Sequence, residues 1–179
     1  SYLDFEDWRE QSTVSWGMAF ARGITALQRG ADGAELLTIA AVTDDFFSVM
    51  GVRPLLGRTF LRDELRGGTR PMVLPHGVWT TRFGADSSIV GRTIDVGEGG
   101  ATVVGIMPPG FDWPEWAQAF VPLATLTGGD RASLERRDFR VDNRVVARLS
   151  PGATLESART ELRSISRRLS DAFPETNLG

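Results

Sequence analysis

The sequence predicts an α+β domain, and three stretches support that prediction. Residues 16–28, "WGMAFARGITALQ", alternate large and small side chains with the period of a β-strand. The turn sequence "RGADG" and an apolar run, "ELLTIAAV" at 35–42, follow directly and indicate a second strand. Near the other end, "VDNRVVARL" at 141–149 is typical of a strand that leads into a long amphipathic helix. With 179 residues, the chain can form one domain or two small lobes that share a core.

The opening residues, "SYLDFEDWREQ", are predicted to form a helix. Ser1 and Asp4 fit the capping pattern in which a small polar residue precedes an acid by three positions. Acidic side chains crowd the first turns, where the helix dipole favours negative charge. Tyr2, Phe5 and Trp8 fall on one face, so this helix has a side to bury.

The stretch "FFSVMGVRPLLGRTF", residues 46–60, is predicted to be scaffold rather than part of a binding site. Thr43 can cap a short helix that begins with two acids and has an apolar side. Gly51 is placed as its left-handed stop, and Pro54 prevents the helix from resuming. We expect the phenylalanines of this stretch to be buried and its arginines to hold the loop or face solvent.

The middle of the chain is predicted to alternate short strands and helices. "MVLP" is typical of a short strand, and a helix then starts near Pro75 and stops at Gly84. "VGRTIDVGEGGATVVGIM" indicates a hairpin around residues 97–100. "PPGFDWPEW" must be irregular, because consecutive prolines fit neither a helix nor a strand ladder. A short strand, "AFVPLATL", and a polar loop or short helix, "TGGDRASLERRD", complete this region.

The strand at 141–149 has one apolar and one polar face. The apolar face has Val141, Val145, Ala147 and Leu149, and the polar face has Asp142, Arg144 and Arg148. Thr154 then caps a long helix that ends before Pro174. The apolar face of that helix comprises Leu155, Ala158, Leu162, Ile165, Leu169 and Phe173. We expect this helix to pack on the strand.

Composition excludes several classes of function. The net charge of −3 argues against nucleic-acid binding, which needs a clustered basic surface. The chain has no lysine, so it has neither the P-loop lysine of standard ATPases nor a Schiff-base lysine. It has no cysteine, which removes thiol nucleophiles, thiolate metal sites and disulfides. No segment resembles a signal peptide or a membrane span; the most apolar run, Leu36–Val42, is far shorter than the roughly 18 residues that a span needs.

No catalytic constellation emerges from the polar residues. His76 is the only histidine, so we expect it at a helix start or on the surface rather than in a metal or Ser-His-Asp site. The acidic pairs, Asp44/Asp45 and Asp63/Glu64 among them, are sequence neighbours and do not face each other across a cleft as a glycosidase requires. We therefore predict no catalytic, cofactor-binding or metal-ligating residue, no cofactor and no enzyme activity.

Three groups of residues have two interpretations each. Arg53 and Arg58 could grip an anion beside Gly57, but they are more typical of salt-bridging or solvated arginines. Trp113 and Trp116 could mark an interface, and we favour a role in capping the core. The arginines of the last helix that recur every four residues are a solvated face or a docking surface: Arg159, Arg163 and Arg167.

Taken in order, several segments resemble the MacB-like periplasmic core domain of bacterial ABC transporter permeases. The most specific are "GVRPLLGRTF" at 51–60, "VVGIMPPGF" at 103–111 and "LSPGATLESA" at 149–158. The likeness extends from "YLDFEDWREQ" to "PETN", nearly the whole chain. Two features depart from the family pattern. Pro75 stands where such sequences often have a small polar cap, and the strands expected before the first helix and after the last are not visible.

The resemblance implies an α+β fold in two parts. A porter-like βαβ lobe is formed by both chain ends, and a mixed β-rich, Sabre-like module is inserted between them. On this sequence we place the lobe at 1–30 and 137–179 and the module at 31–136. The chain begins in a helix and ends just past another, which is consistent with a domain excised from a longer protein.

The resemblance also implies a function, that of an extracytoplasmic domain of a MacB/FtsX-like permease. Such a domain transmits ATP-driven conformational change to export or to partner activation, on the periplasmic face of the bacterial inner membrane. Its expected partners are its own transmembrane helices, a separate ATP-binding subunit or domain, and a second permease copy or a periplasmic adaptor. Two alternatives stay open: a sensory domain that binds a small ligand, and a carboxylate-based hydrolase.

Overall fold

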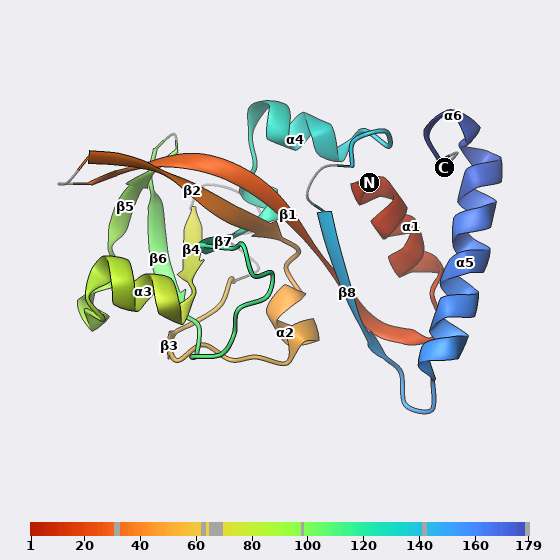
Figure 1. Ribbon diagram of the computed structural model, residues 1–179, viewed down its shortest axis with the longest axis horizontal. Helices are drawn as coiled ribbons and strands as arrows, with labels where there is room; N and C mark the ends of the chain where they lie inside the picture. The colour runs from red at the N-terminus through yellow and green to blue at the C-terminus, as the bar shows by residue number, and fades with distance from the viewer. Residues whose placement is uncertain (31–32, 62–63, 65–69, 98, 141–142, 178–179) are drawn as a thin grey trace.

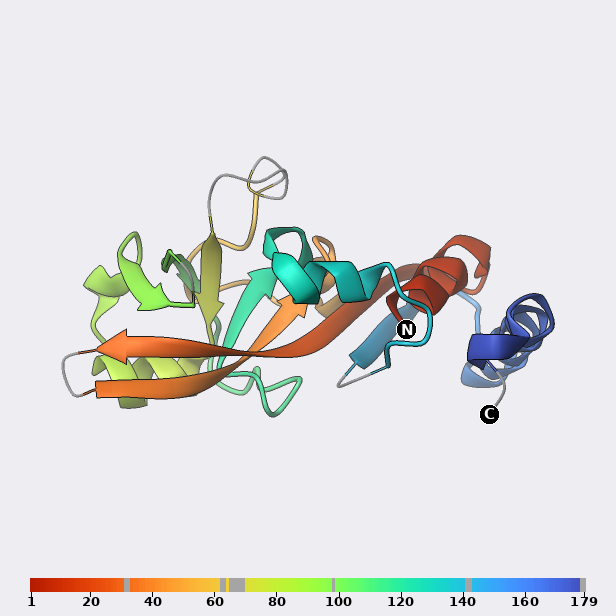
Figure 2. The same ribbon diagram turned by 90° about the horizontal axis from the view of Figure 1, so that it is seen from above.

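Figure 1 shows the computed structural model of the chain, which describes residues 1–30, 33–61, 64, 70–97, 99–140 and 143–177. One end of the molecule is a barrel-like sheet, and the other end combines one further strand with helices. The strand β1 (Ser15–Gly30) runs from one end to the other. Both chain termini lie at the helical end (Figure 1). The fold is therefore α+β, as the sequence predicts, and it is elongated along β1 (Figure 2).

The barrel-like sheet is closed by six strands of the described chain. Besides β1 they are β2 (Gly33–Val42), β4 (Pro71–Leu74), β5 (Thr93–Val96), β6 (Ala101–Ile106) and β7 (Ala119–Pro122). β1 and β2 form a long antiparallel hairpin, and the ring continues from β2 through β7, β4, β6 and β5. It closes where β5 returns to β1, through Gln28 opposite Val96 and Arg29 opposite Asp95. This last ladder has two residue pairs, and we call it the seam of the barrel.

The helical end is built on the first half of β1. There β1 pairs antiparallel with β8 (Asn143–Leu149), from Ser15 opposite Leu149 to Arg22 opposite Asn143. The helix α1 (Tyr2–Gln11) packs on β1, α5 (Leu155–Ala172) packs on α1, and α6 (Pro174–Asn177) packs on α5. The capping box of Ser1 and Asp4 and the Thr154 cap of α5 form as the sequence predicts, and Ser157 completes a second capping box at Thr154.

The helices and turns of the middle region also follow their sequence signals. α2 (Phe46–Met50) ends at Gly51, which has φ of 70°, and α3 (His76–Phe83) ends at Gly84, which has φ of 60°. The polar stretch after β7 forms the short helix α4 (Gly128–Leu134). β5 and β6 form the predicted hairpin, although Glu98 in its turn lies outside the described residues, as do residues 31–32 of the first hairpin.

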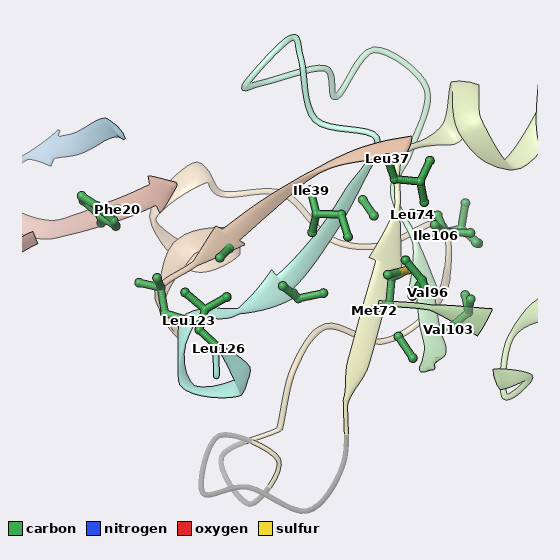
Figure 3. Close-up of a cluster of buried hydrophobic side chains, with 14 of the residues drawn as sticks. Phe20, Leu37, Ile39, Met72, Leu74, Val96, Val103, Ile106, Leu123 and Leu126 are labelled. Atoms are coloured by element: carbon green, nitrogen blue, oxygen red, sulfur yellow. The ribbon is translucent and has the colours of Figure 1, made fainter. Parts of the chain in front are cut away.

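One hydrophobic core extends along β1 through both ends of the molecule. Met18 and Phe20 belong to the same buried cluster as Phe5 of α1, and Ile24 and Ala26 further along β1 pack against that cluster inside the barrel. Figure 3 shows this continuity, from Phe20 at one side to the barrel side chains at the other. The barrel side chains of this cluster include Leu37, Ile39, Met72, Leu74, Val96, Val103, Ile106 and Val121. The two ends of the molecule therefore do not have separate cores.

The opposite face of the sheet is covered by a second cluster, rich in aromatic side chains. Phe46 and Phe47 of α2 are buried there, as the sequence predicts for this stretch. The ring centroids of Phe120 in β7 and Phe47 are 5.4 Å apart. Trp113 stacks on Phe46, with ring centroids 5.8 Å apart. Trp116 packs on the same cluster, so the interpretation of both tryptophans as core-capping is confirmed.

Thr43 does not cap α2, which corrects the sequence prediction. Its N–H donates to the carbonyl of Phe20, and its Oγ1 accepts from the Phe20 N–H, at 3.0 and 3.1 Å. Both groups of Thr43 therefore extend the β1–β2 pairing, and its side chain is buried. α2 begins only after the turn at Asp44 and Asp45.

The long last helix does not cover β8 as expected. Val145 and Ala147 lie opposite Phe20 and Met18 in the β1–β8 ladder and so face the expected side of the sheet. Val145 is nevertheless 37% exposed, and Ala147 is exposed as well. The reason is that β8 is an edge strand, whereas α5 packs chiefly against α1 and α6. Val141 and Asp142 of the predicted strand lie outside the described residues.

Two glycines of the family-like segments face each other across a strand crossing. Gly57, in β3 (Leu56–Gly57), is paired with Gly105 in β6. A Cβ on Gly57 would lie 2.2 Å from the carbonyl oxygen of Val104, and one on Gly105 would lie 2.2 Å from that of Arg58. Both contacts are with backbone, which cannot rotate away. The close approach of the two backbones therefore requires glycine at both positions.

We predict that Gly105→Ala lowers the free energy of unfolding by about 2–3 kcal/mol, because the methyl group must displace backbone in a packed sheet. Urea denaturation of the purified chain measures the change. Gly77→Ala is the matched control: it lies in α3, a Cβ there meets nothing within 4 Å, and alanine favours a helix. Equal stability of Gly105→Ala and the wild type would contradict this explanation of the glycine pair.

Candidate functional site

The polar residues singled out in the sequence do not assemble into a reaction centre. Among the described residues, no three His, Asp or Glu side chains gather in a way that could hold a metal ion. His76 is the first residue of α3 and packs edge-on against Trp79, with ring centroids 5.5 Å apart, so it is the helix-start histidine that the sequence predicts. Arg58 donates two hydrogen bonds to Glu64, at 2.8 and 2.7 Å, and thus holds its loop, while Arg53 is exposed.

The most elaborate polar site in the described structure joins the two ends of the chain. We call it the chain-end cluster: Ser1, Asp4, Asp7, Arg137, Arg140 and Asn177. Asp4 lies at its centre and is 3% exposed. The carboxylate of Asp4 accepts from Arg137 at 2.7 Å and from Asn177 at 2.9 Å, and Arg140 lies 3.2 Å away. The cluster thus connects α1, the segment before β8 and α6.

The ion pairs of the chain-end cluster are strongly favoured in their charged form. Burial raises the pKa of Asp4, but the hydrogen bonds from Asn177, Ser1 and Arg137 outweigh it and hold the pKa well below its usual range. Arg137 donates to Asp7 as well, at 2.7 Å, and its guanidinium lies 3.8 Å from the ring centroid of Phe173. Asp4 is therefore both the helix cap that the sequence predicts and the hub of an ion-pair network that it does not predict.

A second polar tie fastens the segment between α1 and β1 to α5. The carboxylate of Glu161 accepts from Ser12 Oγ, from the N–H and Oγ1 of Thr13, and from the N–H of Val14, over distances of 2.6–3.3 Å. Burial raises the pKa of Glu161, but these hydrogen bonds outweigh it and lower the pKa from 4.5 to about 2. A single side chain of α5 thus fixes the point at which the chain enters β1.

Where the helical end meets the barrel, β1 carries a buried arginine. Arg22 is 5% exposed and donates to the carbonyl of Asp130 at 2.9 Å, to the carboxylate of Asp130 at 3.2 Å, and to Ser133 Oγ. Its guanidinium also lies 4.7 Å from the ring centroid of Phe139. Arg22 therefore fastens α4 to β1 at the middle of the molecule.

Two of the cavities beside these elements have walls that combine apolar side chains with at least one arginine. One of about 310 Å³ lies between α1 and the ends of β2 and α4, and Tyr2, Arg9, Val42 and Arg131 contribute to its walls. The other, of about 410 Å³, lies along the seam of the barrel, and we call it the seam cavity. Its walls are mainly apolar: Ile24, Ala26, Ile39, Met72, Val96, Ala101, Val121 and Leu126.

The basic face of α5 is exposed. Arg159, Arg163 and Arg167 all face solvent, and none of them forms an ion pair with another described residue. Arg168 differs, since it donates to Gln11 of α1 at 2.8 Å. Exposure agrees with a solvated face and leaves the alternative of a docking surface as a prediction.

The fold agrees with comparisons to known proteins. The chain matches the family of the MacB-like periplasmic core domain over residues 1–165. It therefore belongs to that family, which is the periplasmic core domain of ABC transporter permeases rather than a family of enzymes. Family membership places it on the extracytoplasmic side of the membrane. In the part of the chain that the structure describes, no helix is both long and apolar enough to cross a membrane.

Solved structures share this fold at low sequence identity. One is the extracellular domain of the noncanonic ABC-type transporter YknZ from Gram-positive bacteria, with a TM-score of 0.70 and 17% identity over 96% of this chain and 83% of that one. Another is the periplasmic region of MacB from Actinobacillus actinomycetemcomitans, with a TM-score of 0.70 and 14% identity over 98% of this chain and 75% of that one. No curated protein sequence matches the chain.

We predict that Asp4→Asn lowers the free energy of unfolding by about 3 kcal/mol, because it leaves the largely buried guanidinium of Arg137 without the buried carboxylate that it shares with the more exposed Arg140. Asp7→Asn is the matched control: its side chain is more exposed, and we expect a loss of about 1 kcal/mol. Chemical denaturation at neutral pH measures both. Equal losses for the two variants would contradict the central position of Asp4.

We predict that Glu161→Gln costs about 1–2 kcal/mol at pH 7, since an amide cannot accept four hydrogen bonds as the carboxylate does. The folded-state pKa of Glu161 is below the usual 4.5, so the folded state binds this proton more weakly than the unfolded state does. Its contribution is complete above about pH 4.5 and is lost as the pH falls toward 2. The stability difference between variant and wild type should shrink over that range in a pH series; a constant difference would contradict this assignment.

Proposed function

We propose that this chain is the extracytoplasmic domain of a MacB/FtsX-like ABC transporter permease that transmits ATP-driven conformational change to export or to partner activation. The observation that carries the proposal is the continuity of β1 and its core. One strand and one buried cluster join the end that holds both chain termini to the barrel at the far end. A displacement applied at the termini would thus reach the barrel through packed structure rather than through a hinge.

The polar ties support this role because of where they lie. The chain-end cluster holds α1, α6 and the segment before β8 together, so a pull on either terminus acts on both. Glu161 fixes the entry to β1, and Arg22 fixes α4 where β1 enters the barrel. The ties are thus spaced along the route from the termini to the barrel, which a transmitting element needs.

We propose the division into lobes on the same basis. The porter-like lobe would comprise residues 1–30 and 137–179, and the inserted Sabre-like module residues 31–136. β8, α5 and the first half of β1 support the first assignment, since they form one layer with α1. The second half of β1 is shared, because from Ala21 onward it pairs with β2 inside the barrel.

The proposed partners follow from what the chain has and lacks. Since the chain has no lysine, ATP would be hydrolysed by a separate ATP-binding subunit or domain. The domain's own transmembrane helices would connect to the helical end, where both termini lie (Figure 1). A second permease copy or a periplasmic adaptor would receive the motion at the bacterial inner membrane.

A small-ligand role is the second candidate, and one observation favours it. The seam cavity is mainly apolar, has a few polar groups and falls within the roughly 300–1,000 Å³ that is typical of ligand sites. A carboxylate-based hydrolase is not supported by any comparable observation. A ligand site and a transmitting role do not exclude each other.

We predict that Arg22→Met in the parent permease lowers export, or partner activation, per ATP hydrolysed by at least fivefold. The methionine fills the space but cannot fasten α4 to β1. The ATPase rate itself should change less than twofold, because the ATP-binding part is separate. The assay compares coupled output with ATP hydrolysis in reconstituted vesicles, with the exposed Arg163→Met as control. An unchanged ratio in a folded Arg22→Met variant would contradict the transmission route.

A further inference from the structure

We propose that the seam cavity binds a compact, mainly apolar molecule that carries one anionic group. The proposal does not rest on the transmission role, although Asp130 at the rim of the cavity is also the partner of Arg22. No residue that lines this cavity belongs to the chain-end cluster or to the hydrogen bonds around Glu161.

The cavity lies beside a short stretch of β1 that has no strand partner on one edge among the described residues. On that edge the ladder to β8 ends at Arg22, and the ladder to β5 begins at Gln28. Between them, residues 23–26 pair with β2 on their other edge only, within the described part of the chain, and the carbonyl of Leu27 accepts from the N–H of Gly97 at 2.9 Å. α4 and the turn before it cover the opening from one side, through Leu126, Thr127 and Asp130.

The floor of the gap is apolar and belongs to the barrel core. Ile24 and Ala26 point toward it from β1, and both are only partly buried. Met72, Val96 and Ala101 form the opposite wall. Figure 3 shows Met72 and Val96 close together on the barrel side of this cluster. Ile24 and Ala26 thus expose apolar surface at this opening, in front of the buried Met72, Val96 and Ala101, and covering that surface with an apolar group is favourable.

The polar groups at the rim favour an anion. Arg70 lines the cavity beside Gly97, and its Nη2 lies 3.8 Å from where a Cβ on Gly97 would be. A guanidinium has five N–H donors and suits a carboxylate well. The acid at the described rim, Asp130, is engaged by Arg22 at 3.2 Å, which offsets its charge. Since Asp130 is the one acid among the described residues that line the cavity, a ligand carboxylate would lie near Arg70, with its tail over Ile24 and Ala26.

The test uses decanoate as the probe and the whole chain in solution. Backbone amide NMR spectra locate the contact, and isothermal titration below the aggregation concentration measures the affinity. We expect shifts to concentrate at residues 23–27, 70–72 and 96–101 of the described chain. Decyltrimethylammonium, which has the same tail and the opposite charge, should bind at least tenfold more weakly than decanoate.

Two variants with matched controls test the geometry. Ala26→Phe fills the cavity and should weaken decanoate binding at least tenfold, whereas Ala147→Phe, on the exposed face of β8, should not. Arg70→Gln should weaken decanoate severalfold and leave the affinity for decanol unchanged, with the exposed Arg53→Gln as its control. If Ala26→Phe fails to fold, the proposal is tested by the amide shifts of the wild type and by the decanoate affinity of Arg70→Gln.

The proposal is overturned if the shifts lie away from the seam, if folded Ala26→Phe binds decanoate as well as the wild type, or if both charged probes bind equally. Because none of these assays involves ATP or a membrane, their failure would leave the transmission proposal standing. If Arg22→Met leaves export or partner activation per ATP unchanged, that result would contradict the transmission proposal but not the ligand site.

Discussion

The rest of the structure depends on one strand, β1, and on its pairing with three others. Its 16 residues pair with β8 at the helical end, with β2 along the hairpin and with β5 at the seam. Because side chains alternate along a strand, one face of β1 contributes to a single core at both ends, and the other face lies under the aromatic cluster of α2. A shift of β1 by one residue would reverse both faces, so its register is strongly constrained.

Polar groups act where this apolar framework is interrupted. Arg22 lies at the point where β1 leaves β8 and enters the barrel, and its two Nη groups donate hydrogen bonds to α4, which offset the cost of a charge inside the core. At the termini, the small helical layer has little area to bury, and ion pairs around Asp4 supply part of its cohesion. Such pairs contribute geometric specificity as well as energy, because a guanidinium aligns two carboxylates at once. The same pairing gap that requires Arg22 leaves the seam cavity next to it.

The sequence predicts features that depend on neighbours along the chain. The capping box at Ser1, the glycine stops at Gly51 and Gly84 and the β5–β6 hairpin are all local, and all are confirmed. Contacts between distant segments give no such signal. Arg137 meets Asp4 across 133 residues, and Glu161 meets Thr13 across 148, so neither tie could be foreseen. The errors have the same origin, since the β1 pairing recruits Thr43, and the packing of α5 on α1 leaves Val145 exposed.

The central claim is that the domain moves as one body from its termini to its barrel. The chain has no cysteine, so spin labels at Arg163→Cys on α5 and Thr81→Cys on α3 report one distance along its long axis. The measurement compares this distance in the full permease with and without ATP, alongside the distance from the α5 label to one on a membrane helix. The account predicts that ATP changes the second distance and leaves the first unchanged. A change of several ångströms in the first, with the second constant, would contradict it.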